Sequence, residues 1–286
     1  MIKIGKFSIS YAFIFMLMVS FFGRFFDFFL IAYTSAIIHE FFHIMLAKIF
    51  KVKILSIEFL PFGITAKLEN SVIKEPNIEI IIACAGPISN ILILMILFII
   101  NKYFCINKFY YDYAFVVNIF MFILNMLPII PLDGGRILRA LLTKSWGILK
   151  SYNFLIKLSY FFSSILIIVS LFLLLTSPFN FSLILIGSFL LGNLTVQNRQ
   201  VNLIFLKEIL NSNNKLSKSN INKIKFIAVF DVLPAIKILK HFTYNSYYVI
   251  KVLDKNMKII NTLTETQVVN SILKFGANIK CGKINI

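Results

Sequence analysis

The chain has 286 residues, of which 59% are hydrophobic and 14% are charged, and its formal net charge is +17. Its mean hydropathy is +0.86, and an ordinary soluble domain has about 25% charged residues. A purely soluble protein is excluded, because its core could not use so much apolar surface; a lipid bilayer must be part of the solvent. The excess of Lys and Arg then indicates cytoplasmic loops beside anionic lipid, and no direct partner among nucleic acids is expected.

Charge-poor stretches predict about six membrane-spanning helices, since about 20 apolar residues cross a bilayer as a helix. The first stretch lacks a small-residue cleavage site and is expected to be a retained anchor. The last is too long for one span, and a turn at Ser177–Asn180 is expected to divide it. The stretches are residues 7–23, a second from Phe28 that includes His39 to His43, 80–101, 113–132 and 158–198.

Loop charges predict the orientation of these helices. Lys and Arg gather before the first helix and after the second and fourth, which fall on one side of a six-helix topology; Arg24, Lys102 and Lys108 fall on the other. The positive-inside rule therefore places both termini in the cytoplasm. The residues on the richer side are Lys3, Lys6, Lys48, Lys51, Lys53, Lys67, Lys74, Arg136, Arg139, Lys144 and Lys150.

Two further segments are not membrane helices. Residues 52–70 alternate in polarity around a turn at Pro61-Phe62-Gly63; they are interpreted either as a β-hairpin, whose edge could bind an extended substrate, or as a plain connecting loop. Three regions are expected overall: a transmembrane domain over 1–196, a linker over 197–225 and a small α/β module over 226–286. The module's expected strand–helix–strand–strand–helix elements are Phe226–Phe230, Val232–His241, Tyr247–Val252, Met257–Ile260 and Thr264–Phe275.

The motif His39-Glu40-Phe41-Phe42-His43 predicts a metal site. Two histidines four residues apart project from one helix face and can share one zinc ion, and the glutamate can take a proton from a zinc-bound water. A surface helix with two histidines is the alternative in a soluble chain. Here the motif falls at membrane depth, where ionisable side chains are costly and indicate function.

A catalytic zinc ion needs a third protein ligand. The three cysteines have no metal-like spacing, and the third histidine, His241, falls in the C-terminal module. Asp133, after two prolines and before Gly134, is the predicted ligand, with a helix cap as its alternative role. Asp27 is expected on the opposite side of the membrane, too far away to contribute.

Two more polar segments lie near this depth. Asn125 is two helical turns before Asp133, and either oxyanion stabilisation or an interhelical hydrogen bond remains open for it. Gly86-Pro87-Ile88-Ser89-Asn90 interrupts the third helix. Its small residues favour close packing against the helices that carry the motif.

Together these motifs resemble the site-2 proteases, a family of polytopic zinc metalloproteases that perform regulated intramembrane proteolysis. The resemblance rests on His39–His43, Ala85–Asn90 and Asn125–Gly134, in family order over about 100 residues. It implies an α-helical polytopic membrane protein with a membrane-associated β-hairpin. It also implies one zinc ion held by His39, His43 and Asp133, with Glu40 as the catalytic base and Asn125 assisting.

The layout, with one helix before the motif and a C-terminal module resembling a CBS domain, is similar to the bacterial sporulation branch of the family. That likeness implies a pro-sigma-K-like substrate, inhibitory membrane proteins as partners and a place in the mother-cell membrane around the forespore. ATP binding by the module is in doubt, because Gln267 follows Thr264-Glu265-Thr266 where an acidic residue is usual. Docking of substrate or self-association through the module is the alternative.

Other functions remain open. One is proteolysis of another membrane-bound regulator; another is a non-catalytic metal-binding transporter or scaffold. A transporter should carry polar residues along several helices, whereas the stretch after Lys157 is nearly free of ionisable groups. An intact Glu40 argues against a scaffold, which has no use for a base there.

Overall fold

The computed structural model describes residues 1–61, 63–68, 76–104, 107–176, 184, 186–195, 224–239, 241–242, 247–276 and 278–284. The chain divides into two compact units, Met1–Ala140 with Leu158–Leu190, and Leu141–Lys157 with Leu191–Ile286. Phe62, the turn predicted at Ser177–Asn180 and most of the linker predicted over 197–225 lie outside the described residues.

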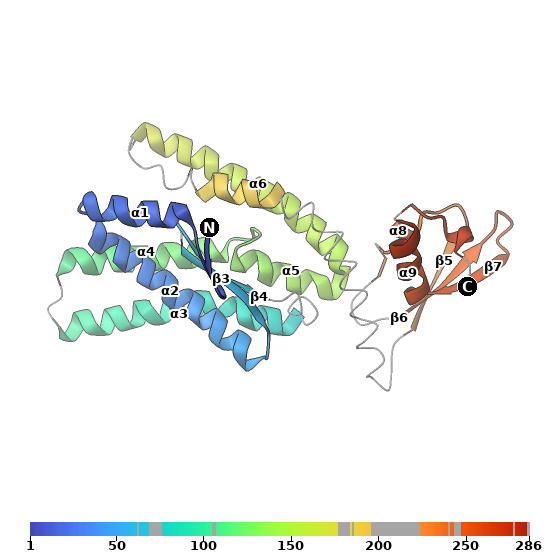
Figure 1. Cartoon of the computed structure of the whole chain (residues 1–286), viewed down its shortest axis with the longest axis horizontal. Coiled ribbons are helices and arrows are strands. Elements are labelled where there is room, and N and C mark those ends of the chain that lie inside the picture. Colours follow the sequence, from blue (N-terminus) through green and yellow to red (C-terminus); the bar gives the residue numbers. More distant parts are fainter. Residues whose placement is uncertain are drawn as a thin grey trace. The chain divides into compact units, whose positions relative to one another are not determined.

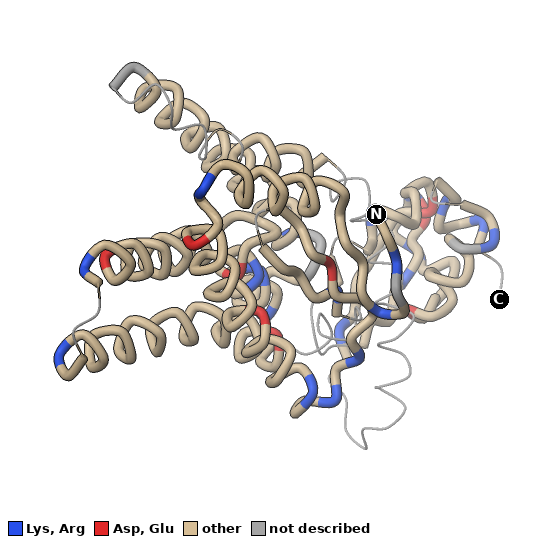
Figure 2. Tube along the Cα trace, turned by 60° about the vertical axis from the view of Figure 1, so that its left-hand side comes forward, with Lys and Arg blue, Asp and Glu red and all other residues tan. Residues whose placement is uncertain are grey.

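All the predicted apolar stretches carry helices. Within the described residues, four are long and apolar enough to cross a membrane, and two apolar helices, α1 (Tyr11–Phe22) and Ile186–Thr195, are shorter. In Figure 2 the long apolar helices carry their Lys and Arg towards one end and are otherwise almost free of them, as expected for spans that place their apolar middles in lipid. The four long helices are α2 (Phe26–Ile49), α3 (Pro76–Tyr103), α4 (Lys108–Met126) and α6 (Ile148–Thr176).

The fourth predicted helix differs from the structure at its end. Helix α4 stops at Met126 rather than at residue 132, and a separate amphipathic helix, α5 (Asp133–Trp146), begins at Asp133. Leu127, which precedes Pro128, adopts an extended conformation, as steric contact with a following proline favours. The prolines therefore end one helix and leave Asp133 in the first turn of the next.

A four-stranded sheet accompanies the membrane helices. Its order is β1-β2-β3-β4, so β4 is an edge strand. The predicted hairpin over 52–70 is confirmed as antiparallel β3 and β4, whereas β2 occupies the start of the stretch expected to be the first helix. The strands are β1 (Ile2–Ile4), β2 (Phe7–Ile9), β3 (Ile54–Leu60) and β4 (Gly63–Leu68).

Helix α2 lies at the centre of the first unit, Met1–Ala140 with Leu158–Leu190, which is called the membrane unit below. It packs against α1, α3 and α4, and strand β4 lies along it (Figure 1). Ala47 on α2 and Ile82 on α3 are fully buried, and Leu46, Phe50, Val52, Leu68 and Ile78 pack around them. This apolar cluster fixes α2, α3 and the sheet relative to one another next to the predicted metal ligands.

The C-terminal module has the predicted element order. Parallel β5–β6 and antiparallel β6–β7 form its sheet. Strand β6 buries alternate residues, including Ile250 and Val252, and α9 buries Val268 and Val269, which gives the module an apolar core. The elements are β5 (Ile224–Phe230), α8 (Ala235–Leu239), β6 (Tyr247–Leu253), β7 (Ile259–Thr264), α9 (Glu265–Phe275) and a 3₁₀ turn at Cys281–Lys283.

Candidate metal centre

The two histidines of the motif face the interior of the helix bundle. His39 and His43 are 6% and 3% exposed, and they lie one turn apart on α2. Their Nε2 atoms are 3.2 Å apart, because residues at i and i+4 share a helix face. The prediction that both imidazoles point to one place is confirmed.

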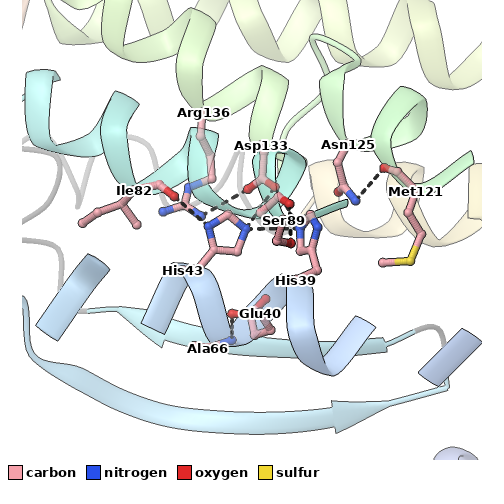
Figure 3. A network of polar contacts seen from close by, with 11 residues as sticks. His39, Glu40, His43, Ala66, Ile82, Ser89, Met121, Asn125, Asp133 and Arg136 are labelled. Atoms are coloured by element: carbon pink, nitrogen blue, oxygen red, sulfur yellow. Dashed lines mark hydrogen bonds and ion pairs between the residues drawn. The ribbon is translucent and has the colours of Figure 1, made fainter. Parts of the chain in front are cut away.

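Asp133 completes the cluster from α5. Its Oδ2 atom lies 3.1 Å from Nε2 of His39 and 3.1 Å from Nε2 of His43, as Figure 3 shows. Its other oxygen, Oδ1, lies 3.5 Å from the Arg136 guanidinium one turn further along α5. The carboxylate therefore presents one oxygen to the histidines while its second interacts with a cation.

These three atoms fit a tetrahedral metal ion. Zinc bonds of about 2.0–2.1 Å keep tetrahedral ligands about 3.3–3.4 Å apart, close to the spacing seen here. In the neutral form of His43, Nδ1 donates to the carbonyl oxygen of Ile82 at 2.7 Å, which leaves Nε2 as an acceptor. Nε2 of His43 and Oδ2 of Asp133 are then two acceptors 3.1 Å apart, and a divalent ion bound between them and Nε2 of His39 would satisfy all three atoms at once.

Gly86 on α3 leaves the space for this arrangement. A Cβ atom at this position would overlap Nε2 of both His39 and His43. Helix α3 continues through Pro87 without interruption, so the expected break is wrong, whereas the expected close packing against the motif is confirmed. Ser89 donates to the Gly86 carbonyl at 2.7 Å.

Glu40 points to the sheet rather than to the three candidate metal ligands. Its Oε1 atom accepts a hydrogen bond from the main-chain N–H of Ala66 on β4, at 2.6 Å (Figure 3). The motif's carboxylate therefore lies between the metal ligands on α2 and the edge strand of the sheet.

Backbone contacts hold Asp133 in place. A Cβ atom at Gly134 would overlap the carbonyl groups of Met126 and Leu127, and one at Gly135 would overlap the backbone of Ile129. The start of α5 therefore packs directly on the segment that ends α4. Only a residue without a side chain allows that approach.

A buried ion pair ties the same helix to α3. Arg139 on α5 pairs with Glu79 in the first turn of α3, and their side chains are 12% and 2% exposed. Asp133 and Arg139 share α5, and Glu79 and Gly86 share α3. The pair therefore fixes the two helices that bring the carboxylate and the glycine to the histidines.

Comparison with known proteins identifies the family. The sequence model of peptidase family M50 matches residues 27–109 and 106–170. The chain belongs to this family. The matched residues include all three candidate metal ligands, Glu40 and Asn125, and the donor set agrees with zinc as the cofactor.

Several relatives are similar over part of their length. A zinc metalloprotease of Methanocaldococcus jannaschii is 34% identical over 176 residues, which cover 60% of this chain and 50% of that protein. Stage IV sporulation protein FB of Bacillus subtilis is 27% identical over 174 residues, which cover 61% of this chain and 59% of that protein. The chain thus matches half to three-fifths of the length of these curated relatives.

A solved site-2 protease from Methanocaldococcus jannaschii has a similar fold. The TM-score is 0.54 at 30% identity, over 68% of this chain and 92% of that one. The membrane unit of this family M50 member therefore has the site-2 protease fold.

Asn125 lies near the end of α4 and donates from Nδ2 to the carbonyl of Met121 in its own helix, at 3.0 Å. Its assisting role stays a prediction.

The sequence did not predict the roles of Glu79, Arg139 and the Ala66 N–H. Glu79 and Arg139 lie 60 residues apart. Every residue except proline has a main-chain N–H, so the sequence does not indicate which one donates.

Proposed function

We propose that this member of peptidase family M50 is an intramembrane zinc metalloprotease. The observation that carries the proposal is the convergence of His39, His43 and Asp133, with Glu40 beside them, within a bundle of apolar helices. Soluble proteases meet their substrates in water, whereas charged groups at membrane depth are retained only where function requires them.

Each residue of the candidate site has a separate role in the proposed reaction. His39, His43 and Asp133 would hold the ion, and zinc bound there supplies a Lewis acid that activates water and polarises a peptide carbonyl. Glu40 accepts the proton of the attacking water and returns it to the leaving amine. Asn125 would donate a hydrogen bond to the developing oxyanion after releasing its bond to Met121.

The substrate is proposed to bind as an extended strand on the edge of β4. A helical substrate hides its carbonyl groups in its own hydrogen bonds, so the scissile segment must unwind before attack. An edge strand offers the unpaired main-chain groups that a new strand needs. The contact of β4 with Glu40 puts this edge beside the base.

The substrate class we propose is a membrane-associated sigma-factor precursor resembling pro-sigma-K. The similarity to stage IV sporulation protein FB supports a sporulation role, in the mother-cell membrane around the forespore and under inhibitory membrane proteins. The C-terminal module, with the strand–helix–strand–strand–helix order of a CBS domain, would dock a partner or a second copy. The loop charges support cytoplasmic termini.

The test is co-expression with a tagged pro-sigma-K-like protein in a heterologous bacterium. Wild type and Glu40→Gln are compared on an immunoblot, with Glu58→Gln as a matched control, because Glu58 lies on β3 and pairs with Lys67. A shorter product from wild type and Glu58→Gln alone supports the protease and its base. Full cleavage by Glu40→Gln contradicts the mechanism.

The metal content separates the remaining outcomes. Suppose that the substrate remains uncut by wild type and by both variants. In that case, wild type should bind one zinc ion per chain and His39→Ala should bind none if the protein is a protease with a different substrate. A purified chain without metal contradicts the proposal and favours a scaffold.

A further inference from the structure

The hydrogen bonds of β3 show which way the main chain of β4 faces. The Ile57 N–H donates to the Lys6 carbonyl at 2.8 Å, and the Phe59 carbonyl accepts from the Ser10 N–H at 3.0 Å. The polar groups of Ile57 and Phe59 therefore face away from β4. In an antiparallel ladder their partners are then non-hydrogen-bonded positions.

Those partners are Ala66, opposite Ile57, and Ile64, opposite Phe59. Their N–H and C=O groups consequently point out of the sheet at its edge, because β4 is the last strand in the order. Ala66 and Ile64 are thus two equivalent outward positions one pleat apart, where an added strand would find its main-chain partners.

One of the two donors already has an acceptor. The Ala66 N–H donates to Oε1 of Glu40 at 2.6 Å, a short hydrogen bond to a carboxylate. Glu40 reaches it from α2, where it neighbours the ligand His39. The β3–β4 ladder fixes the direction of this N–H, so the donor has a defined position towards which the Glu40 side chain is held.

We propose that Ala66 is a positioning residue whose main-chain N–H holds Glu40 in place for proton transfer, while Ile64 provides the outward N–H that pairs with an extended substrate. The inference rests on the proposed protease function and deepens it. The edge of β4 has two separate tasks, so Ala66 acts on the rate of the chemical step and Ile64 acts on binding.

The test removes each N–H without changing a side chain. An amide-to-ester replacement at Ala66, and the same replacement at Ile64 as matched control, each delete one outward donor; the side chains and the β3 ladder donors stay. At Ala66 we expect kcat to fall about 10- to 100-fold, as for loss of a hydrogen bond to a charged group, with KM and zinc content unchanged. At Ile64 we expect KM to rise with kcat unchanged.

A second readout does not depend on turnover. Affinity for a non-cleavable extended peptide should fall in the Ile64 ester and stay at the wild-type value in the Ala66 ester.

Ala66→Pro and Ile64→Pro form a genetically encoded second pair, since proline is tolerated at outward positions of edge strands. In a Glu40→Asp background, whose shorter side chain cannot reach β4, the Ala66 ester should cause no further loss of kcat.

The outcomes are distinct. If the Ala66 ester weakens peptide binding and leaves kcat at the wild-type value, the donor belongs to the substrate and the inference is overturned. Equal kcat, KM and affinity in wild type and both esters overturn it as well. Failure of the proposed function would instead appear as no difference between wild type and Glu40→Gln.

Discussion

The membrane unit and the C-terminal module use buried polar groups differently. In the membrane unit, His39, His43 and Asp133 come from two helices and meet at one point. In the module, Glu265 is 4% exposed and accepts a hydrogen bond from the Tyr248 N–H at 3.2 Å, beside an apolar core. Ionisable residues at membrane depth thus indicate a functional site, whereas the hydrophobic periodicity of the module indicates only its fold.

The largest effect is expected from Gly86→Ala in the membrane unit. The added methyl group would occupy the space of the two Nε2 atoms, so the histidines could not converge on the ion. We expect loss of bound zinc and a fall in cleavage of at least about 100-fold, since the metal supplies the Lewis acid. Metal analysis and the cleavage assay measure the two effects.

Gly192→Ala is the control for this substitution. A Cβ atom at Gly192 meets nothing within 4 Å, and alanine favours a helix over glycine by about 1 kcal/mol. Zinc content and cleavage should therefore match wild type. Normal zinc content in Gly86→Ala would show that the packing of α3 does not limit the site.

The sequence predicted those features that follow from hydrophobic periodicity and from the placement of charges. The apolar stretches, the hairpin over 52–70 and the His39–His43 spacing each follow from local pattern. Asp133 was predictable because a carboxylate at that depth is costly. The end of α4 was placed six residues too late, at 132 rather than Met126, because hydrophobicity continues through the prolines after the helix has stopped.

The strand pairings and side-chain contacts that the sequence did not predict depend on the tertiary structure. Strands β1 and β2 pair through a turn at Gly5, whose φ is 62°, and that glycine between two alternating triplets was a usable hairpin signal. The parallel pairing of β2 with β3 carries no such signal. The same holds for the bond between Ala66 and Glu40 and for the pair of Glu79 with Arg139.

Breaking that ion pair should destabilise the membrane unit. Glu79→Ala removes the buried carboxylate that pairs with Arg139, and removal of one partner of a buried pair costs about 3–5 kcal/mol. We expect a matching fall in the free energy of unfolding in detergent. Lys67→Ala is the control, because Lys67 is 59% exposed in its pair with Glu58 and such pairs contribute at most about 1 kcal/mol. Equal losses in the two variants would contradict a structural role for the buried pair.

In the module, the corresponding effect depends on pH. Burial raises the pKa of Glu265 to about 7, against the hydrogen bond from Tyr248, which lowers it. The folded module thus binds a proton more tightly than the unfolded chain, so its stability is highest below about pH 4.5 and falls as pH rises to about 7. We expect a loss of about 2–3 kcal/mol across this range.

Hydrogen exchange of β6 and α9 in the full chain, corrected for the intrinsic pH dependence, measures this loss. Glu265→Gln keeps the shape of the side chain and removes the titration, so its protection should not vary with pH in this range. A wild-type module whose protection is equally independent of pH would place Glu265 in contact with water.

The smallest effect is expected at the start of α9. Thr264 and Gln267 form a reciprocal cap: the Thr264 N–H donates to Oε1 of Gln267 at 2.8 Å, and the Gln267 N–H donates to Oγ1 of Thr264 at 3.4 Å. Thr264→Ala should cost about 1 kcal/mol, seen as faster exchange in the first turn of α9, and Thr264→Ser should restore most of it. Zinc content should stay at the wild-type value in both variants, because these contacts stabilise a fold and do not assemble a site. A fall in zinc content would instead mean that the fold of the module controls the metal centre, and the contrast between the two regions would fail.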